Sequence, residues 1–204
     1  YFRCSVEQLH IHQHDVCDGN INCKITGDDE ALCFNWQCPS TCTCIMYAIE
    51  CLTPKSSIQI YKFPMSKYVA VSGQNVPIWE GSLLCNSPNL FFLSIRNNCI
   101  TEIKPRSFVR NTILEYLDIG YNLITFIAKQ TFDRLQKLRF LYIMHNRLHI
   151  TDYFTFRDIH SLQVLSLNDN NIYKLQAGSF SSLFNLSALD LSANHINGLW
   201  RNIF

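Results

Sequence analysis

The ten cysteines are the residues of this 204-residue chain that most clearly indicate chemistry, and eight of them precede residue 52. Thiols crowded in this way form disulfide bonds or bind a metal ion such as zinc. Neither Cys-x-x-Cys pairs nor zinc-finger spacings occur in the chain. A catalytic thiol would need a histidine or asparagine partner, and none is discernible. We therefore expect disulfide bonds and an oxidising, extracellular setting.

Residues 1 to 34 hold four of these cysteines among several further landmarks. The landmarks are Phe2-x-Cys4, a Cys17-Asp18-Gly19 turn, Cys23 and the run Asp29-Glu30-x-x-Cys33. This pattern resembles the low-density-lipoprotein receptor class A module, a small domain with three disulfide bonds and a calcium site. The resemblance implies the bonds Cys4–Cys23 and Cys17–Cys33. His10 stands where the family has its third cysteine, so one bridge of the family is missing.

The same resemblance implies a calcium site. The family's ligands correspond here to the side chains of Asp18, Asn22, Asp29 and Glu30. About thirty residues cannot bury an adequate core and need bridges or a metal, and calcium takes about six to eight oxygen ligands. Asn22 replaces an acid of the family, and one extra residue separates Cys23 from Asp29. The alternative to a calcium site is a solvated acidic loop.

His10, His12 and His14 alternate along the chain, so an extended segment would place all three on one face. One interpretation is a zinc site. A solvent-facing hairpin strand is the interpretation we prefer, because no further ligand is identifiable.

Residues 66 to 204 must supply the scaffold, because they repeat one 24-residue pattern, degenerate in its first copy. Leucine occupies the first and fourth positions, and an aliphatic residue the sixth. The ninth-position residues are Asn98, Asn122, Asn146, Asn170 and Asn194. The nineteenth-position residues are Phe108, Phe132, Phe156, Phe180 and Phe204. This pattern resembles the leucine-rich repeat, which implies an α/β solenoid with a curved parallel sheet on its concave face. About five and a half repeats are present, and the last is cut short at Phe204.

A single repeat cannot fold alone. Its apolar side chains contribute roughly 10–20 kcal/mol when buried, whereas ordering its backbone costs roughly 24–48 kcal/mol. Stacked repeats share one core and stabilise one another. We expect the buried asparagines to bond backbone groups left unpaired where each strand bends away. The nineteenth-position phenylalanines are expected to fill the convex side.

Residues 35 to 65 contain the other four of the first eight cysteines, in the spacing Cys38-Pro39-x-x-Cys42-x-Cys44-x6-Cys51. This spacing resembles the cysteine-rich N-terminal cap of extracellular leucine-rich repeats. The resemblance implies the disulfide bonds Cys38–Cys44 and Cys42–Cys51. Such a cap would shield the first repeat's core from water, and each bridge contributes about 2–5 kcal/mol.

Strand side chains alternate between two faces, so positions three, five and seven line the concave face if four and six point into the core. Aromatic residues form a column along the first four strands: Tyr68, Phe92, Tyr116 and Phe140, with Tyr142 and Met144 beside it. Exposed aromatic patches often mark binding surfaces, although neighbouring rings could merely shield the sheet. The candidate ligand-binding residues are Phe92, Tyr116, Asp118, Phe140, Tyr142 and Asp190.

Two further signals lie in the repeats. Asn185-Leu186-Ser187 is the N-glycosylation sequon of the chain. Cys85 and Cys99 fall at different repeat positions, and we expect free, half-buried thiols rather than a bridge between them.

The order of the domains carries a further resemblance. A class A module directly before a cysteine-capped leucine-rich array resembles the ectodomain of leucine-rich-repeat G-protein-coupled receptors of the relaxin-receptor type. It implies that the concave face captures a peptide or protein hormone, with a relaxin- or insulin-like hormone as one candidate, and that the class A module assists activation. In that family acidic residues of the concave face meet arginines of the hormone, and the resemblance implies that Asp118 and Asp190 are the positions here that could do so. It also implies a location outside the plasma membrane and a seven-helix domain beyond Phe204.

Other classes of function compete with this receptor. A secreted or cell-surface adhesion or matrix protein would carry the same modules without a seven-helix domain. An enzyme is not expected, because no G-x-S-x-G, H-E-x-x-H or G-x-G-x-x-G motif is present. The net charge of +1 favours neither nucleic acid nor an anionic membrane, and no apolar run approaches the roughly 20 residues that span a bilayer.

Overall fold

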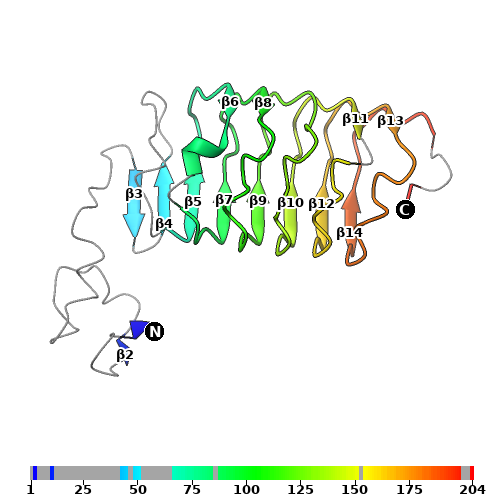
Figure 1. Cartoon of the computed structure of the whole chain (residues 1–204). Coiled ribbons are helices and arrows are strands. Elements are labelled where there is room, and N and C mark those ends of the chain that lie inside the picture. The colour runs from blue at the N-terminus through cyan, green and yellow to red at the C-terminus, as the bar shows by residue number, and fades with distance from the viewer. Residues whose placement is uncertain are drawn as a thin grey trace.

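An eight-stranded sheet dominates the computed structural model, which describes residues 2–3, 10–11, 42–45, 48–51, 66–84, 87–151, 154–198 and 203–204. The strands lie side by side in the order β14-β12-β10-β9-β7-β5-β4-β3 (Figure 1). Their bounds are β3 Cys42–Ile45, β4 Ala48–Cys51, β5 Tyr68–Val71, β7 Phe92–Ser94, β9 Tyr116–Asp118, β10 Phe140–Tyr142, β12 Val164–Ser166 and β14 Ala188–Asp190.

From β5 to β14 every strand pairs in parallel with the strand 24 residues further along the chain. Phe92 of β7 pairs with Tyr116 of β9, and Phe140 of β10 pairs with Val164 of β12. One repeat therefore makes one complete coil, and the predicted parallel-strand solenoid is confirmed. Residues that share a repeat position form straight rows across the sheet.

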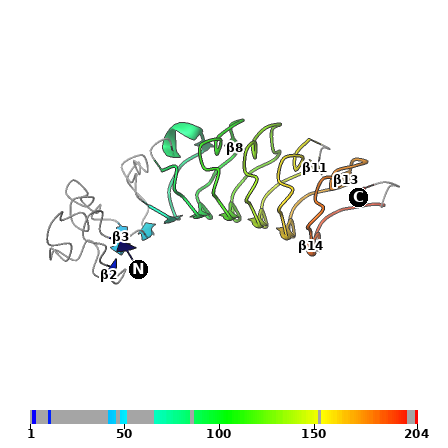
Figure 2. The same ribbon diagram turned by 60° about the horizontal axis from the view of Figure 1, so that its bottom comes forward.

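The side opposite the sheet is built from turns, short strands and one 3-10 helix. These elements are η3 (Gly81–Leu84) and the parallel pairs β6 (Ile78–Trp79) with β8 (Glu102–Ile103), and β11 (Ile150–Thr151) with β13 (Lys174–Leu175). Figure 2 shows the coils spreading apart on this side, which is therefore the convex one. No α-helix occurs among the described residues. Arg106 (φ 60°) and Gln130 (φ 64°) have left-handed backbone conformations. A right-handed α-helix cannot continue through such residues.

The repeat's apolar positions form one continuous core. The fourth- and sixth-position side chains of β5, β7, β9, β10 and β12 and of the residues after them are all buried. Thr151 takes the fourteenth position, which is aliphatic in most repeats, and is buried as well. Its hydroxyl lies 3.3 Å from Ser179 Oγ, which explains how a polar side chain is accommodated there.

The ninth-position asparagines form a ladder that links each coil to the previous one. Asn170 Oδ1 accepts the Leu148 N–H (3.0 Å), and Asn170 Nδ2 donates to the carbonyl oxygens of Ile143 and Leu167, both at 3.0 Å. The same 27-residue contact to the previous coil recurs at Asn98, Asn122, Asn146 and Asn194. The predicted role of these asparagines, satisfying backbone groups where the strand bends away, is confirmed.

The nineteenth-position phenylalanines form a second row, on the convex side. Successive rings from Phe108 to Phe204 lie 6.4, 6.2, 5.9 and 5.7 Å apart, centroid to centroid. The first four rings are buried, whereas Phe204 at the last described position is exposed. Stacked rings of this kind add to the free energy gained by burial alone.

The N-terminal cap closes the sheet with two antiparallel strands. β3 and β4 pair so that Cys42 faces Cys51, and these two residues form a disulfide bond, as the cap resemblance implied. β4 then continues the sheet in parallel with β5. Cys44 is also disulfide-bonded, and its expected partner Cys38 lies outside the described residues.

The expected class A module is described only in part. Strands β1 (Phe2–Arg3) and β2 (His10–Ile11) pair in an antiparallel manner, in line with the hairpin expected around His10. The other predicted module residues lie outside the described ranges: Cys4, His12, His14, Cys17, Asp18, Asn22, Cys23, Asp29, Glu30 and Cys33.

Cys99 departs from its expected environment. Its thiol is free, as predicted, but exposed rather than half-buried. The residue follows the buried Asn98 in a tight turn and has a positive φ of 58°, which directs its side chain away from the core. Cys85 lies outside the described residues. No helix in the described part of the chain is long and apolar enough to cross a membrane.

Adjacent asparagines allow a direct test of the ladder. We expect Asn170→Ala to lower the free energy of unfolding by about 3 kcal/mol, because it leaves several buried backbone groups without partners. The exposed Asn171 is the matched control, and Asn171→Ala should change this free energy by less than about 0.5 kcal/mol. Urea unfolding followed by circular dichroism measures both. Equal effects of the two substitutions would contradict a structural role of the ladder.

Candidate functional site

The concave face carries the predicted aromatic residues as one continuous group. We call Tyr68, Phe92, Tyr116, Phe140 and Tyr142 the aromatic column. The Phe92 and Tyr116 rings stack 4.3 Å apart with only 15° between their planes. Tyr116 lies 6.2 Å from Phe140 and 5.2 Å from Tyr142. In-register strands hold these rings side by side. The predicted column of adjacent aromatic rings is therefore present on the concave face.

A hollow of about 430 Å³ opens beside the first two rings of the aromatic column. Its lining includes Tyr68 and Phe92 as aromatic walls, the small residues Ala48 and Ala70, and the carboxylate-bearing Glu50. Ala48 pairs with Tyr68, and Glu50 pairs with Ala70, so the cap strand β4 extends the concave rows. Small side chains next to rings leave the ring faces accessible. We call this space the concave hollow.

Sequence analysis missed the contribution of β4 to this hollow. A signal was available, because Ala48 and Glu50 alternate with Ile49 and Cys51, which are both buried. That alternation predicts a half-buried strand, but the register of the strand against the first repeat could not be read from the repeat period.

Asp118 lies on the concave side of β9, yet it is not an exposed acid. Its side chain is covered and the residue is only 3% exposed. The Asp118 carboxylate accepts the Gly120 N–H at 2.9 Å and lies 3.7 Å from the Arg96 guanidinium. Burial raises the pKa of Asp118, while the Gly120 hydrogen bond and Arg96 oppose that rise. The expectation that Asp118 stands ready for a cationic partner needs correction, because Arg96 already occupies that role.

Asp190, in contrast, is exposed on the concave side of β14. Its Oδ1 accepts hydrogen bonds from the Ser192 hydroxyl (2.6 Å) and the Ser192 N–H (3.0 Å). These two hydrogen bonds lower the pKa of Asp190. Of the two predicted concave acids, Asp190 is the one that remains accessible to a ligand.

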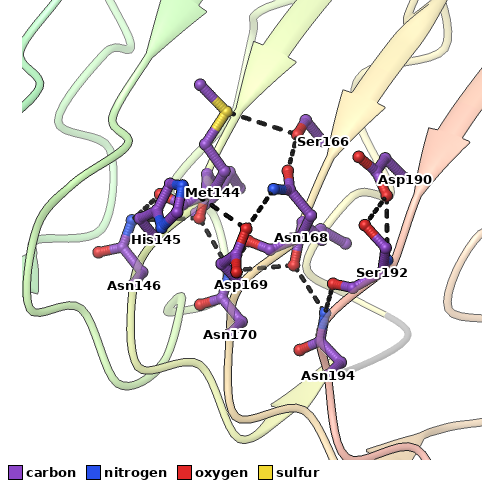
Figure 3. A network of polar contacts seen from close by, with 12 residues as sticks. Met144, His145, Asn146, Ser166, Asn168, Asp169, Asn170, Asp190, Ser192 and Asn194 are labelled. Atoms are coloured by element: carbon purple, nitrogen blue, oxygen red, sulfur yellow. Dashed lines mark hydrogen bonds and ion pairs between the residues drawn. The ribbon is translucent and has the colours of Figure 1, made fainter.

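Between Tyr142 and Asp190 the concave edge holds a chain of polar contacts (Figure 3). Ser166 Oγ donates to Asn168 Oδ1 at 2.6 Å, and Asn168 Nδ2 donates to Asp169 Oδ2 at 2.6 Å. Asp169 Oδ2 in turn lies 3.5 Å from His145 Nε2. The His145 ring packs 4.2 Å from the ring of Tyr121. The face therefore changes from aromatic near the cap to polar near β14.

This polar chain does not form a catalytic arrangement. Ser166 directs its hydroxyl to Asn168 rather than to His145, and no hydrogen bond joins this serine to a base among the described residues. No group of three or more histidine, cysteine or acidic side chains in the described ranges could hold a metal ion. The chemistry that these residues support is recognition through rings, amides and carboxylates.

The predicted sequon lies at the end of a coil. Asn185 is exposed, and its Nδ2 donates to the His160 carbonyl oxygen at 2.8 Å. The neighbouring Phe184 is also exposed, and its ring stacks on His160 at 5.8 Å. Asn185 is therefore accessible on the surface, away from the concave strands.

The sequence profile of the family described as "Leucine rich repeat" matches residues 88–148 and 151–196, which together are more than half of the chain. The chain belongs to the leucine-rich repeat family. A search of curated proteins finds no match.

Solved leucine-rich repeat structures support the same fold. The TLR13–ssRNA13 complex matches with 25% identity and a TM-score of 0.67, covering 76% of this chain and 22% of that one. The Toll–Spatzle complex of Drosophila matches with 24% identity and a TM-score of 0.60, covering 67% and 20%. The LRIM1/APL1C complex matches with 19% identity and a TM-score of 0.68, covering 80% and 32%. The chain thus spans between a fifth and a third of the length of these structures.

The two concave acids should respond to pH in opposite directions. An acid with a raised pKa holds its proton more tightly in the folded chain, so ionisation of Asp118 lowers stability as pH rises through its folded pKa. Asp118→Asn removes this loss, so the variant should gain stability relative to wild type as pH rises. Asp190→Asn should lose relative stability as pH rises from the lowered folded pKa of Asp190 to the ordinary value of 3.8, a lower pH range than that of Asp118. Thermal unfolding at a series of pH values measures both, and trends of equal sign would contradict the assignment.

Proposed function

We propose that this chain is the extracellular ligand-binding region of a leucine-rich-repeat G-protein-coupled receptor, and that a peptide or protein hormone binds to its concave face. The observation that carries the proposal is the aromatic column, five ring-bearing residues packed in contact on one face. Tyrosine and phenylalanine are enriched where proteins bind proteins. The Cys42–Cys51 disulfide supports an oxidising, extracellular location.

In this proposal the three predicted parts of the chain have different roles. Residues 66–204 form the repeat array that binds the hormone, and residues 35–65 form its disulfide-bonded cap. Residues 1–34 form the class A module, which holds calcium and assists activation of a seven-helix domain that follows in the full protein. This part of the proposal rests on the cysteine and acid pattern of the sequence.

The chemistry of the concave face favours a protein ligand over a nucleic acid. One similar structure is a complex with a single-stranded RNA. The net charge of this chain is only +1, which gives little attraction for a phosphate backbone. The exposed Asp190 and the half-exposed Asp169 would repel phosphates on this face.

Two tyrosines of equal exposure provide the test of the concave site. Tyr68 is 46% exposed in the aromatic column, and Tyr173 is 47% exposed outside it. For the hormone that binds, Tyr68→Ala should weaken affinity by about tenfold or more, because tyrosines that a partner buries are typical binding hot spots. Tyr173→Ala should leave affinity within about twofold. The measurement is biolayer interferometry with a panel of synthetic relaxin- and insulin-like peptides on the immobilised chain.

Two outcomes would contradict the proposed function. If no peptide of the panel binds, the hormone-receptor assignment fails, and a secreted or cell-surface matrix protein with the same modules takes its place. If a peptide binds but Tyr173→Ala weakens it as much as Tyr68→Ala, the concave face is not the site.

Calcium binding by residues 1–34 is tested separately. We expect the full chain to bind calcium with a dissociation constant of about 10⁻⁴–10⁻³ M, as extracellular modules do. Glu30→Gln should weaken this binding, because it removes a charged ligand, while Glu80→Gln in the repeats should not. Isothermal titration calorimetry and near-ultraviolet circular dichroism detect the binding. No response at millimolar calcium would rule out the site.

A further inference from the structure

The concave hollow beside the cap strand β4 is lined by one charged side chain, that of Glu50. The rest of its lining is uncharged, and its volume of about 430 Å³ lies within the roughly 300–1,000 Å³ of typical ligand sites. Glu50 is exposed, and in the part of the chain that the structure describes no hydrogen bond or ion pair engages its carboxylate. This carboxylate is therefore available to a cationic group of a ligand.

Two aromatic rings line the same hollow. The centroids of the Tyr68 and Phe92 rings lie 6.1 Å apart, with 34° between the ring planes. Tyr68 is the most exposed residue of the aromatic column, at 46%. The small residues Ala48 and Ala70 leave space beside these rings. The face of an aromatic ring attracts a cation that comes within about 6 Å of its centre, so the rings and the carboxylate favour the same kind of group.

At the edge of the concave face one arginine of the chain contacts both an acid and a ring. The Arg96 guanidinium lies 3.7 Å from the Asp118 carboxylate, and its central carbon lies 4.7 Å from the centre of the Tyr121 ring. Arg139 makes the same two kinds of contact, at 3.3 Å to a glutamate and 5.5 Å to a phenylalanine ring. Acids and rings on neighbouring coils of this fold are thus close enough for one guanidinium to reach both.

The concave hollow has the acid and the rings, but its described lining contains no lysine, arginine or histidine. An arginine from outside the chain fits this gap better than a lysine, because the planar guanidinium stacks on rings and is less strongly hydrated than an ammonium group. A purely apolar side chain would cover the Glu50 carboxylate without pairing it, which is unfavourable.

We propose that the concave hollow receives an arginine side chain of the peptide or protein ligand. The guanidinium pairs with the Glu50 carboxylate, its plane packs on the Tyr68 ring, and its aliphatic stem contacts the apolar lining. This inference rests on the proposed function, because it names the part of the ligand that enters the concave site. It adds the cap strand β4 to the binding surface, at the opposite end of the sheet from Asp190.

A tripeptide tests the hollow without the hormone. Acetyl-Gly-Arg-Gly-amide should bind the full chain and shift the backbone amide signals of Ala48, Tyr68 and Ala70 in a nuclear magnetic resonance titration. Citrulline has nearly the shape of arginine without its charge, so the citrulline tripeptide should bind at least about threefold more weakly. Glu50→Gln should weaken binding of the arginine tripeptide by about threefold to tenfold. The control Glu80→Gln alters an exposed glutamate next to η3, on the convex side, and should leave binding within about 1.5-fold.

The tripeptides also separate the possible occupants of the hollow. A leucine tripeptide that binds as tightly as the arginine tripeptide would show an apolar pocket and overturn the pairing with Glu50. Equal loss in Glu50→Gln and Glu80→Gln would show diffuse attraction to an acidic surface and overturn the site. No signal shift at the hollow with any tripeptide would overturn the inference, whereas the comparison of Tyr68→Ala with Tyr173→Ala would still decide the proposed function.

Peptides of the hormone panel that bind the chain show whether a ligand uses the hollow. At one arginine of such a peptide, replacement by citrulline should weaken affinity for the wild-type chain by about threefold to tenfold. The same replacement should change affinity for the Glu50→Gln chain by less than about twofold, because this chain has already lost the partner. Equal sensitivity of both chains at every arginine would overturn the inference. Binding of the arginine tripeptide without any panel peptide would support the arginine site and reject the relaxin- and insulin-like assignment.

Discussion

The structure depends on one constraint, that the backbone groups freed where each strand bends away must find partners inside the core. The asparagine ladder meets this constraint, because each amide accepts an N–H and donates to a carbonyl oxygen of the previous coil, as Asn146 does with Ile124 and Ile119. A buried amide can satisfy both kinds of group at once, which a carboxylate or an aliphatic side chain cannot. The ladder therefore holds the 24-residue register from coil to coil.

A fixed register turns repeat positions into straight rows, and this has consequences for the concave face. Tyr68, Phe92, Tyr116 and Phe140 occupy one row, so their rings meet although they are 24 residues apart in sequence. The same register places Asp118 between Ser94 and Tyr142, which share its repeat position on the neighbouring strands. Large neighbours then cover a short side chain, which is why Asp118 is buried and its pKa is raised.

Much of this arrangement could be predicted, because a strict period specifies both the core and the rows. The solenoid, the asparagine contacts, the phenylalanine row and the Cys42–Cys51 bond all follow from spacing or from resemblance. Exposure could not be predicted in the same way. A row assigns Asp118 to the concave side, but only the lengths and directions of surrounding side chains decide that Arg96 and its neighbours cover it. The exposure of the Cys99 thiol could not be predicted for a similar reason. Its side chain points outward because the turn gives the residue a positive φ, and the repeat period does not specify that angle.

The two sides of the solenoid differ in how strictly the strand register fixes the backbone conformation. On the concave side the strands are short, and those between β14 and β3 are hydrogen-bonded on both edges. A functional surface on this side must therefore be formed by residues that share a row. On the convex side the coils spread apart, and turns tolerate departures such as η3 and Asn111 (Figure 2). At position 111 the polar side chain has a structural role, because Asn111 Nδ2 donates to the carbonyl oxygen of the buried Ser87, which holds the same repeat position one coil earlier. The binding surface of a repeat protein is therefore best sought in rows of like residues on the sheet, where the fixed register brings distant side chains together.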